Sequence, residues 1–369
     1  MQINDCCVLI PSLSPDERLT YYAKELLDAG FGALVVVDDG SAAEYQPLFR
    51  ELEGMDRCVV LHHEVNRGKG TALKTGMAYI GEHTAFKAVV TADSDGQHRV
   101  EDTLRICASL NGTDRLMILG SRDFSKESVD VPPRSKFGNR VTSAVFRLLY
   151  GRYLPDTQTG LRAFSRDLIP EFLTVSGDRF EYEMNQLIYC ARNDITMQAV
   201  PIRTVYIEEN ASSHFHPIRD SWRIYKLILG SFFRFTMSSL ICWVVDIGLF
   251  TLLDRLILPA VMDRDLTVPI VNMGAIIFIA TYGARIVSSV LNFKLNKDMV
   301  FSIRECRGAG LRYVVLVIAA ALVSSLLVGA FNLLFPSVPA TWFKIPVDLT
   351  IFVANYRIQK DWVFKPSKV

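Results

Sequence analysis

The fold of the first half of the chain is decided by one stretch, Ala88-Val89-Val90-Thr91-Ala92-Asp93-Ser94-Asp95-Gly96-Gln97-His98. It begins with a nearly continuous apolar run, which is typical of a strand covered on both faces of a sheet. Polar residues follow directly, and in open parallel sheets ligands bind beyond the carboxyl ends of the strands. The stretch therefore predicts a buried strand that delivers two carboxylates, Asp93 and Asp95, to a binding site.

Similar apolar runs occur elsewhere in the first half and predict further strands at Cys7–Pro11, Ala33–Asp38, Cys58–His62 and Leu116–Ser121. Helical patterns such as Asp16–Ala29 and Gly70–Ile80 lie between them. This alternation predicts an α/β fold with a mostly parallel sheet. Polar clusters follow the predicted strands, among them Asp38–Ser41 and Gly120–Arg122, which we expect at the same edge of the sheet.

Asp93 and Asp95 are candidate metal ligands, because two carboxylates one residue apart place oxygen atoms side by side. A hard divalent cation is usually held by a few carboxylates and by the phosphates of the substrate. This pattern favours Mg²⁺ or Mn²⁺ together with a diphosphate. A solvated acidic loop remains the alternative for this pair, as a turn with a helix cap does for Asp38–Ser41.

Several function classes are disfavoured by the sequence. The 369 residues carry a net charge of +1 and no tract rich in Lys and Arg, so no nucleic-acid partner is expected. Asn66–Gly70 lacks the upstream glycine and the final Ser or Thr of a phosphate loop. The seven cysteines show no metal-ligand spacing and predict reduced, buried thiols in a protein that faces the cytosol. No cleaved signal peptide is expected at Met1.

The last third of the chain is apolar and predicts four membrane spans: Phe235–Leu253, Leu266–Ala284 continuing toward Phe293, Tyr313–Phe335, and Val338–Tyr356. Asp246, Arg285 and Asp348 lie within these spans, and we expect pairing between helices or placement at the interface rather than ion transport.

An internal repeat supports the fourth span. Asn292–Phe301 matches Asn355–Phe364 at half of its positions, which predicts two helical hairpins in the same orientation. Basic residues gather in the loop after the second span and in the C-terminal tail, so both termini and this loop are expected in the cytosol. The segment before the first span mixes basic and aromatic residues, as in a helix at the membrane surface.

The polar clusters, taken in order, resemble the family 2 glycosyltransferases of the GT-A fold, specifically the polyprenyl-phosphate glycosyltransferases that include the dolichol-phosphate mannose synthases. The clusters that carry this resemblance are Asp38–Ser41, Asn66–Gly70, Asp93–His98, Gly120–Arg122, Pro155–Phe164 and Phe180–Glu183. Where the family often has Tyr-Asn-Glu after the proline of the first strand, this chain has Leu13–Glu17. The repeat resembles a GtrA-like membrane domain.

This resemblance implies three parts. A GT-A (Rossmann-like) nucleotide-sugar domain would occupy residues 1–215, an amphipathic juxtamembrane segment residues 216–230, and an all-α membrane domain of four transmembrane helices residues 231–369. The protein would be an integral protein of the plasma membrane, with its catalytic domain in the cytosol.

On the donor side, the resemblance implies that Pro11, Asp39 and Asp93 surround the nucleoside. Asp95 would be the main metal ligand beside Asp93, and Gln97 would lie near the sugar and the acceptor.

On the acceptor side, Arg122, Arg134 and Ser135 would receive the lipid phosphate. Asp95, Gln97 and Arg122 together form the implied catalytic set.

The expected activity is the inverting transfer of a hexose from a nucleotide-sugar to undecaprenyl or dolichyl phosphate. UDP-hexose is favoured over GDP-mannose as the donor. A lipid-linked sugar flippase with a degenerate soluble domain is one alternative. A processive polysaccharide synthase is another, although its Gln-x-x-Arg-Trp motif is missing from the sequence. Assembly into a homo-oligomer stays open.

Overall fold

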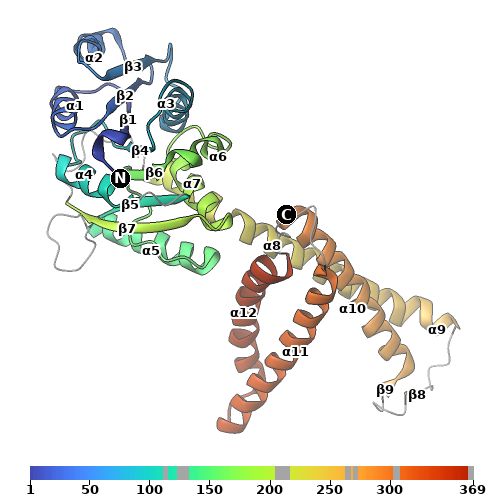
Figure 1. Ribbon diagram of the computed structural model, residues 1–369. Coiled ribbons are helices and arrows are strands. Elements are labelled where there is room, and N and C mark those ends of the chain that lie inside the picture. The colour runs from blue at the N-terminus through green and yellow to red at the C-terminus, as the bar shows by residue number, and fades with distance from the viewer. Residues whose placement is uncertain are drawn as a thin grey trace. The chain divides into compact units, whose positions relative to one another are not determined.

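The computed structural model describes residues 1–110, 115–122, 133–203, 217–261, 267–268, 273–301 and 308–364. It describes the backbone but not the side chains at a few of these positions, including 133–135 and 217–225. The chain divides into two compact units, Met1–Ile228 and Leu229–Val369, which are described separately (Figure 1).

The first unit is built on a seven-stranded sheet in the order β3-β2-β1-β4-β6-β5-β7. Its strands are β1 Cys6–Ser12, β2 Ala33–Asp38, β3 Cys58–His62, β4 Ala88–Thr91, β5 Leu116–Arg122, β6 Arg162–Ser165 and β7 Thr196–Ile202. The first five lie where the apolar runs predicted strands, with ends that differ by no more than about one residue. The sequence patterns did not predict β6 and β7.

Strand direction places several polar clusters at one edge of the sheet. β1, β2, β3 and β4 are joined by parallel pairings, and β5 is parallel to β7. β6 runs antiparallel to both β4 and β5, so β4 and β5 point the same way. The mostly parallel α/β sheet is therefore confirmed, and the carboxyl ends of β1 to β5 share an edge.

Helices cover both faces of this sheet, with α1 and α4 on one side and α3, α6 and α7 on the other (Figure 1). Their bounds are α1 Arg18–Asp28, α2 Gln46–Glu53, α3 Lys69–His83, α4 Val100–Ala108, α5 Pro133–Tyr150, α6 Ile169–Leu173 and α7 Glu181–Arg192. α3 packs closely on β1 because it has a glycine there: a Cβ on Gly76 would lie 2.1 Å from Cδ1 of Leu9.

The prediction of reduced thiols is wrong for one pair of cysteines. Cys6 on β1 and Cys107 on α4 are joined as a disulfide within the core. Their separation of 101 residues leaves no local signal, because only the packing of α4 on the sheet brings them together. The other described cysteines are free and buried, namely Cys7, Cys58, Cys190 and Cys242, whereas Cys306 lies outside the described residues.

The second unit is mainly helical, with α8 Pro217–Leu252 starting in the first unit, α9 Leu258–Val261, α10 Ala275–Leu295, α11 Ala309–Leu334 and α12 Ala340–Ile358. Two short strands, β8 Thr267–Val268 and β9 Met273–Gly274, pair ahead of α10. The second span predicted from Leu266 begins too early, because Thr267–Val268 and Met273–Gly274 are strands and the helix begins at Ala275, while Leu266 itself lies outside the described residues. Val268 precedes a proline, a position that disfavours helix.

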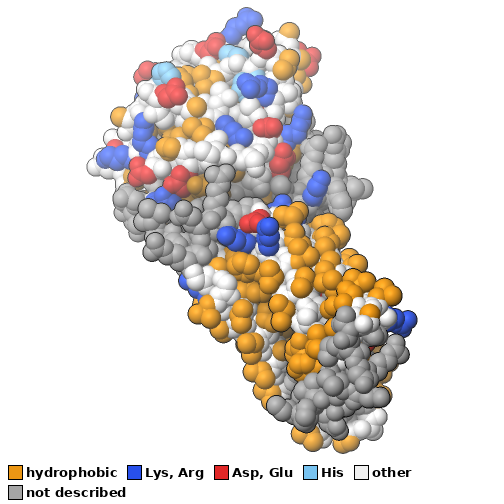
Figure 2. All heavy atoms as spheres, turned by 90° about the vertical axis from the view of Figure 1, so that its right-hand side faces the viewer, with side chains coloured by type: hydrophobic (Ala, Val, Ile, Leu, Met, Phe, Trp, Pro, Cys, Tyr) orange, Lys and Arg blue, Asp and Glu red, His pale blue; other side chains and the backbone are white. Residues whose placement is uncertain are grey.

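By length and composition, two described helices could cross a membrane, Ile276–Val300 and Ala309–Leu334. This finding does not confirm the predicted count of four spans. The face of the second unit in Figure 2 is covered largely by apolar side chains, whereas charged side chains are spread over the first unit. The exposed apolar residues of the second unit include Trp243, Leu326 and Leu333, and an apolar surface of this kind suits contact with lipid.

Asp246, Arg285 and Asp348 all have polar partners in the second unit, as expected from the sequence. Asp246 on α8 binds Arg285 on α10 at 3.2 Å and accepts a hydrogen bond from Ser288 at 2.9 Å. Asp348 accepts a hydrogen bond from Ser324 on α11 at 2.6 Å.

The two halves of the sequence repeat adopt the same local structure. π-Helical segments form at Asn296–Val300 and Gln359–Val363, which are equivalent positions of the repeat. Nδ2 of Asn296 donates to Oε1 of Gln359 at 2.9 Å, so the two equivalent residues bind each other in the buried interior.

Candidate active site

Polar residues from β1, β2, β4 and β5 meet at the carboxyl edge of the sheet. Pro11 is buried near the end of β1, in register with Val37. Asp39 follows β2, Asp93 and Asp95 follow β4, and Arg122 ends β5.

Asp39 organises the loop that leads into α3. One of its oxygens accepts hydrogen bonds from the backbone N–H of Arg67 at 2.9 Å and contacts Nδ1 of His63 at 2.7 Å. The other accepts from the N–H of Gly68 at 2.7 Å. Gly68 has φ +96°, and a Cβ there would lie 2.4 Å from the carbonyl oxygen of Asp178, so a glycine is required. Both carboxylate oxygens of Asp39 are thus engaged, and its predicted contact with the nucleoside stays a prediction.

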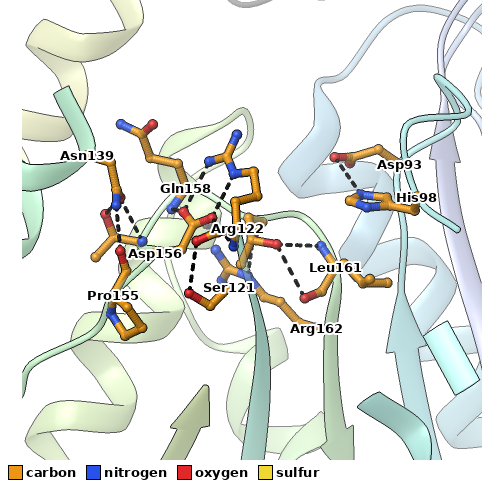
Figure 3. Close-up of polar contacts among 12 residues, drawn as sticks. Asp93, His98, Ser121, Arg122, Asn139, Pro155, Asp156, Gln158, Leu161 and Arg162 are labelled. Atoms are coloured by element: carbon orange, nitrogen blue, oxygen red, sulfur yellow. Dashed lines mark hydrogen bonds and ion pairs between the residues drawn. The ribbon is translucent and has the colours of Figure 1, made fainter. Parts of the chain in front are cut away.

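The loop held by Asp39 places Lys69 between two acids. Nζ of Lys69 lies 2.7 Å from Oδ1 of Asp93 and 3.0 Å from Oε2 of Glu183 on α7. The second oxygen of Asp93 lies 3.4 Å from Nε2 of His98 (Figure 3). Lys69, His98 and Glu183 lie in the motifs Asn66–Gly70, Asp93–His98 and Phe180–Glu183, but the sequence patterns predict no role for these three residues.

Charge pairing fixes the protonation states of Lys69 and Asp93. Burial alone would lower the pKa of Lys69, but the charges of Asp93 and Glu183 outweigh it and raise this pKa above its ordinary value. Burial alone would raise the pKa of Asp93, but the ammonium of Lys69, with His98, holds it far below the usual range. An ammonium and a carboxylate therefore face each other at neutral pH.

Asp95 stands in a different environment from Asp93. Its Oδ1 accepts the backbone N–H of Gln97 at 3.0 Å, and its other oxygen has no hydrogen-bond partner in the described part of the chain. Burial, reinforced by the charge of Asp93, raises the pKa of Asp95. In the described part of the chain, Asp95 is thus the acid of this motif without a salt bridge to a protein cation. A bound divalent cation would offset the unfavourable effect of burial and of the Asp93 charge on its ionised form.

No cluster of three or more His, Cys, Asp or Glu side chains among the described residues is arranged to hold a metal. Mg²⁺ is often bound by one or two carboxylates together with the phosphates of a substrate, and Asp95 could supply one ligand of such a site.

The loop that enters β6 closes the site around Asp93. A Cβ on Gly160 would lie 2.4 Å from one carboxylate oxygen of Asp93 and 2.6 Å from the other. The hydroxyl of Thr91 donates to the carbonyl of Gly160 at 2.9 Å. The buried Arg162 donates to the carbonyl of Glu183 at 2.7 Å, so this loop is tied to both β4 and α7.

Arg122 is held by an acid from the same loop. Its Nε and Nη2 lie 2.7 and 3.1 Å from the two oxygens of Asp156 (Figure 3). The side chain of Asp156 is fully buried, whereas that of Arg122 is 18% exposed. Arg134 and Ser135 lie in the first turn of α5, but their side chains are outside the described residues.

Comparisons with known proteins identify both units. Residues 30–173 match the model of glycosyl transferase family 2, and residues 234–364 match that of the GtrA/DPMS transmembrane domain. UDP-N-acetylglucosamine–dolichyl-phosphate N-acetylglucosaminyltransferase of Methanococcus voltae is 29% identical over 216 residues, covering 54% of this chain and 86% of that protein. Glycosyltransferase AglJ of Haloferax volcanii is 25% identical over 220 residues, covering 59% and 69%.

Among solved structures, glucosyl-3-phosphoglycerate synthase of Mycobacterium tuberculosis is 16% identical, with a TM-score of 0.45 and coverage of 61% of this chain and 79% of that chain. By its two family matches, the chain joins a glycosyl transferase family 2 domain to a GtrA/DPMS transmembrane domain.

Proposed function

We propose that this glycosyltransferase transfers a hexose from a nucleotide-sugar to a polyprenyl phosphate, with UDP-hexose favoured over GDP-mannose. The observation that carries the proposal is the union, in one chain, of a family 2 domain with a GtrA/DPMS membrane domain. A soluble donor and a lipid acceptor would each be served by one unit. The name of the Methanococcus voltae relative, which includes a UDP-sugar and dolichyl phosphate, supports this pairing of substrates.

The proposed reaction needs charge compensation more than a strong base. A phosphate monoester has a second pKa of about 6, so the acceptor is largely dianionic near neutral pH. Its oxygen would attack the anomeric carbon as the bond from that carbon to the nucleoside diphosphate breaks. Direct attack inverts the anomeric centre. The chain must therefore hold two anions close together.

We assign the donor side to the residues after β2 and β4. Asp95 fits as the main ligand of Mg²⁺ or Mn²⁺, which would be shared with the donor diphosphate and would neutralise its charge as it leaves. Asp93 is less available as a second metal ligand, because Lys69 and His98 already contact its two oxygens, and it would lie beside the nucleoside as the resemblance implies. Pro11 and Asp39 would complete the nucleoside pocket.

We assign the acceptor side to Arg122, Arg134 and Ser135, with Gln97 near the transferred sugar. Charge-assisted contacts between arginine and phosphate are strong and directional, which suits a residue that must orient the attacking oxygen. Residues 1–215 would form the catalytic domain, on the cytosolic side of the membrane. Residues 216–230 would form the juxtamembrane segment.

The proposal is tested with the full chain purified and placed in liposomes that contain undecaprenyl or dolichyl phosphate. UDP-hexoses, UDP-N-acetylhexosamines and GDP-mannose are offered in turn with Mg²⁺ or Mn²⁺, and the sugar-lipid product is measured by mass spectrometry. One donor should give product, and Arg122→Ala should raise the KM for the lipid more than that for the donor. Failure with every donor, combined with movement of preformed sugar-lipid between leaflets, would establish the flippase instead.

A further inference from the structure

The loop of residues 155–160, between α5 and β6, contacts both sides of the candidate active site. We propose that Asp156 of this loop is a positioning residue that sets the guanidinium of Arg122 for an anionic acceptor. We further propose that Asn139 ties the same loop to α5. The inference rests on the proposed function for the identity of the acceptor, but its geometry is independent of that identity.

Asp156 is bound to Arg122 through more than one contact. Besides the two contacts to the guanidinium, it accepts the backbone N–H of Arg122 at 3.3 Å and that of Gln158 at 3.0 Å. A bidentate pair of this kind fixes the plane of the guanidinium as well as its position. Preorganisation of a charged group lowers the entropy that is lost when an anion binds.

Asn139 joins this loop to the helix that carries the other predicted acceptor residues. Its side chain is buried, Nδ2 donates to the carbonyl of Pro155 at 2.6 Å, and Oδ1 accepts the N–H of Thr157 at 3.1 Å (Figure 3). Position 135 lies one helical turn before Asn139 on α5. The loop therefore sets the start of α5 and the end of β5 relative to each other.

The donor side begins a few residues further along the same loop. Gly160 touches the carboxylate of Asp93, and a chain of four residues spans at most about 14 Å between Asp156 and Gly160. Within the described residues, Asp156 hydrogen-bonds to Arg122 and Gln158 rather than to Asp93, so a change at Asp156 should act on the acceptor side and leave the donor side almost unchanged, although both sides share one loop.

A purely structural role for the Asp156–Arg122 pair makes a different prediction. A buried ion pair is weak evidence for stability in itself, and removing one partner destabilises a protein wherever the pair lies. Asp102 provides a matched control, because it is also buried, pairs with Arg105 at 2.8 Å and accepts the N–H of Arg203 at 2.8 Å. Asp102→Asn should therefore reproduce the loss of a buried pair without an effect on the acceptor.

The test compares Asp156→Asn with Asp102→Asn in the full chain, in liposomes that contain the polyprenyl phosphate found to be used. Asp156→Asn should raise the KM for the lipid by about 10- to 100-fold, which corresponds to one charge-assisted contact. It should change the KM for the donor by less than about twofold. Asp102→Asn should leave both KM values near those of the wild type.

A double-mutant cycle then asks whether Asp156 acts through Arg122. In an Arg122→Ala background, Asp156→Asn should add less than about a twofold further loss, because the two residues form one unit. An equal loss in both backgrounds, a lower KM for the lipid in Asp156→Asn, or the same KM shift in Asp102→Asn would each overturn the inference.

Binding of a short, water-soluble prenyl monophosphate to the full chain, measured by calorimetry, separates this inference from the proposed function. Weaker binding to Asp156→Asn than to the wild type would support the positioning role even if no polyprenyl acceptor is glycosylated. Equal binding to both would reject that role even if transfer is observed.

Discussion

Gly160→Ala should disable the donor side of the site without adding or removing a charge. A Cβ at this position would lie 2.4 Å from the nearest oxygen of Asp93, whereas an ordinary contact requires about 3.5 Å. The carboxylate must therefore retreat by about 1 Å. The distance of 2.7 Å between Asp93 and Lys69 would then grow beyond the range of a hydrogen bond.

The expected loss follows from that contact. A hydrogen bond to a charged group contributes about 1.5–3 kcal/mol, and each 1.4 kcal/mol is a factor of ten in rate or affinity. The kcat/KM for the donor should fall roughly 10- to 150-fold, while the KM for the lipid changes little. Initial rates at varied donor and saturating lipid, measured with the full chain in liposomes, give both values.

Gly54→Ala is the matched control, because its Cβ would meet nothing closer than 3.4 Å and its φ is −75°. This variant should transfer sugar at the wild-type rate. If Gly160→Ala also keeps the wild-type kcat/KM for the donor, then either Asp93 is not seated against this loop or its position does not matter for transfer. A thermal melt of Gly160→Ala distinguishes a local change from a general loss of the fold.

Three further changes probe the same unit. Asp95→Ala should abolish transfer and weaken Mn²⁺-dependent nucleotide binding at least about 100-fold, whereas full activity in EDTA would refute a metal at Asp95. Lys69→Met leaves two acids without their cation and should lower the kcat/KM for the donor by about 10- to 100-fold, while Lys74→Met on the same helix should have less than about a twofold effect. Burial alone would lower the pKa of His62, but its hydrogen bond to Asp38 and a second acid raise it above the ordinary value. The stabilisation from the protonated ring should be complete below about pH 6.5 and be lost as the pH rises through the raised pKa. The melting temperatures of wild type and His62→Gln should therefore differ most near pH 6 and converge toward pH 8. The difference in the free energy of unfolding should stay below about 1 kcal/mol, because the His62 side chain is 39% exposed.

Most of the strands predicted from the sequence are covered on both faces, and the exception is the half-buried edge strand β3. β1, β2 and β4 are almost wholly buried, so each reads as a continuous apolar run. β7 lies at the edge of the sheet and exposes most of its residues, so its apolar signal is weak. β6 is buried but has only four residues, and one of them is the buried Arg162, whose charge hides the strand in a hydropathy pattern.

Only the site residues that belong to a local sequence motif could be predicted. Asp93 and Asp95 were found because adjacent carboxylates at a strand end are a local pattern. Their partners are not local: Lys69 enters from the start of α3 and Glu183 from α7. These contacts depend on the order of the strands and on a loop held by Asp39, neither of which leaves a short-range signature in the sequence.

In the second unit, too, the sequence repeat predicts local structure but not the packing between distant segments. Matching segments predicted two similar hairpins but not how they pack. Aromatic contacts run between the hairpins: Phe235 of the first hairpin meets Tyr356 of the second edge-to-face, with ring centroids 5.4 Å apart. The equivalent pair, Phe293 and Tyr313, has the same arrangement at 5.3 Å. The first helix of each hairpin therefore packs on the second helix of the other. These two aromatic pairs form only between the hairpins, so the packing joins the two halves of the repeat.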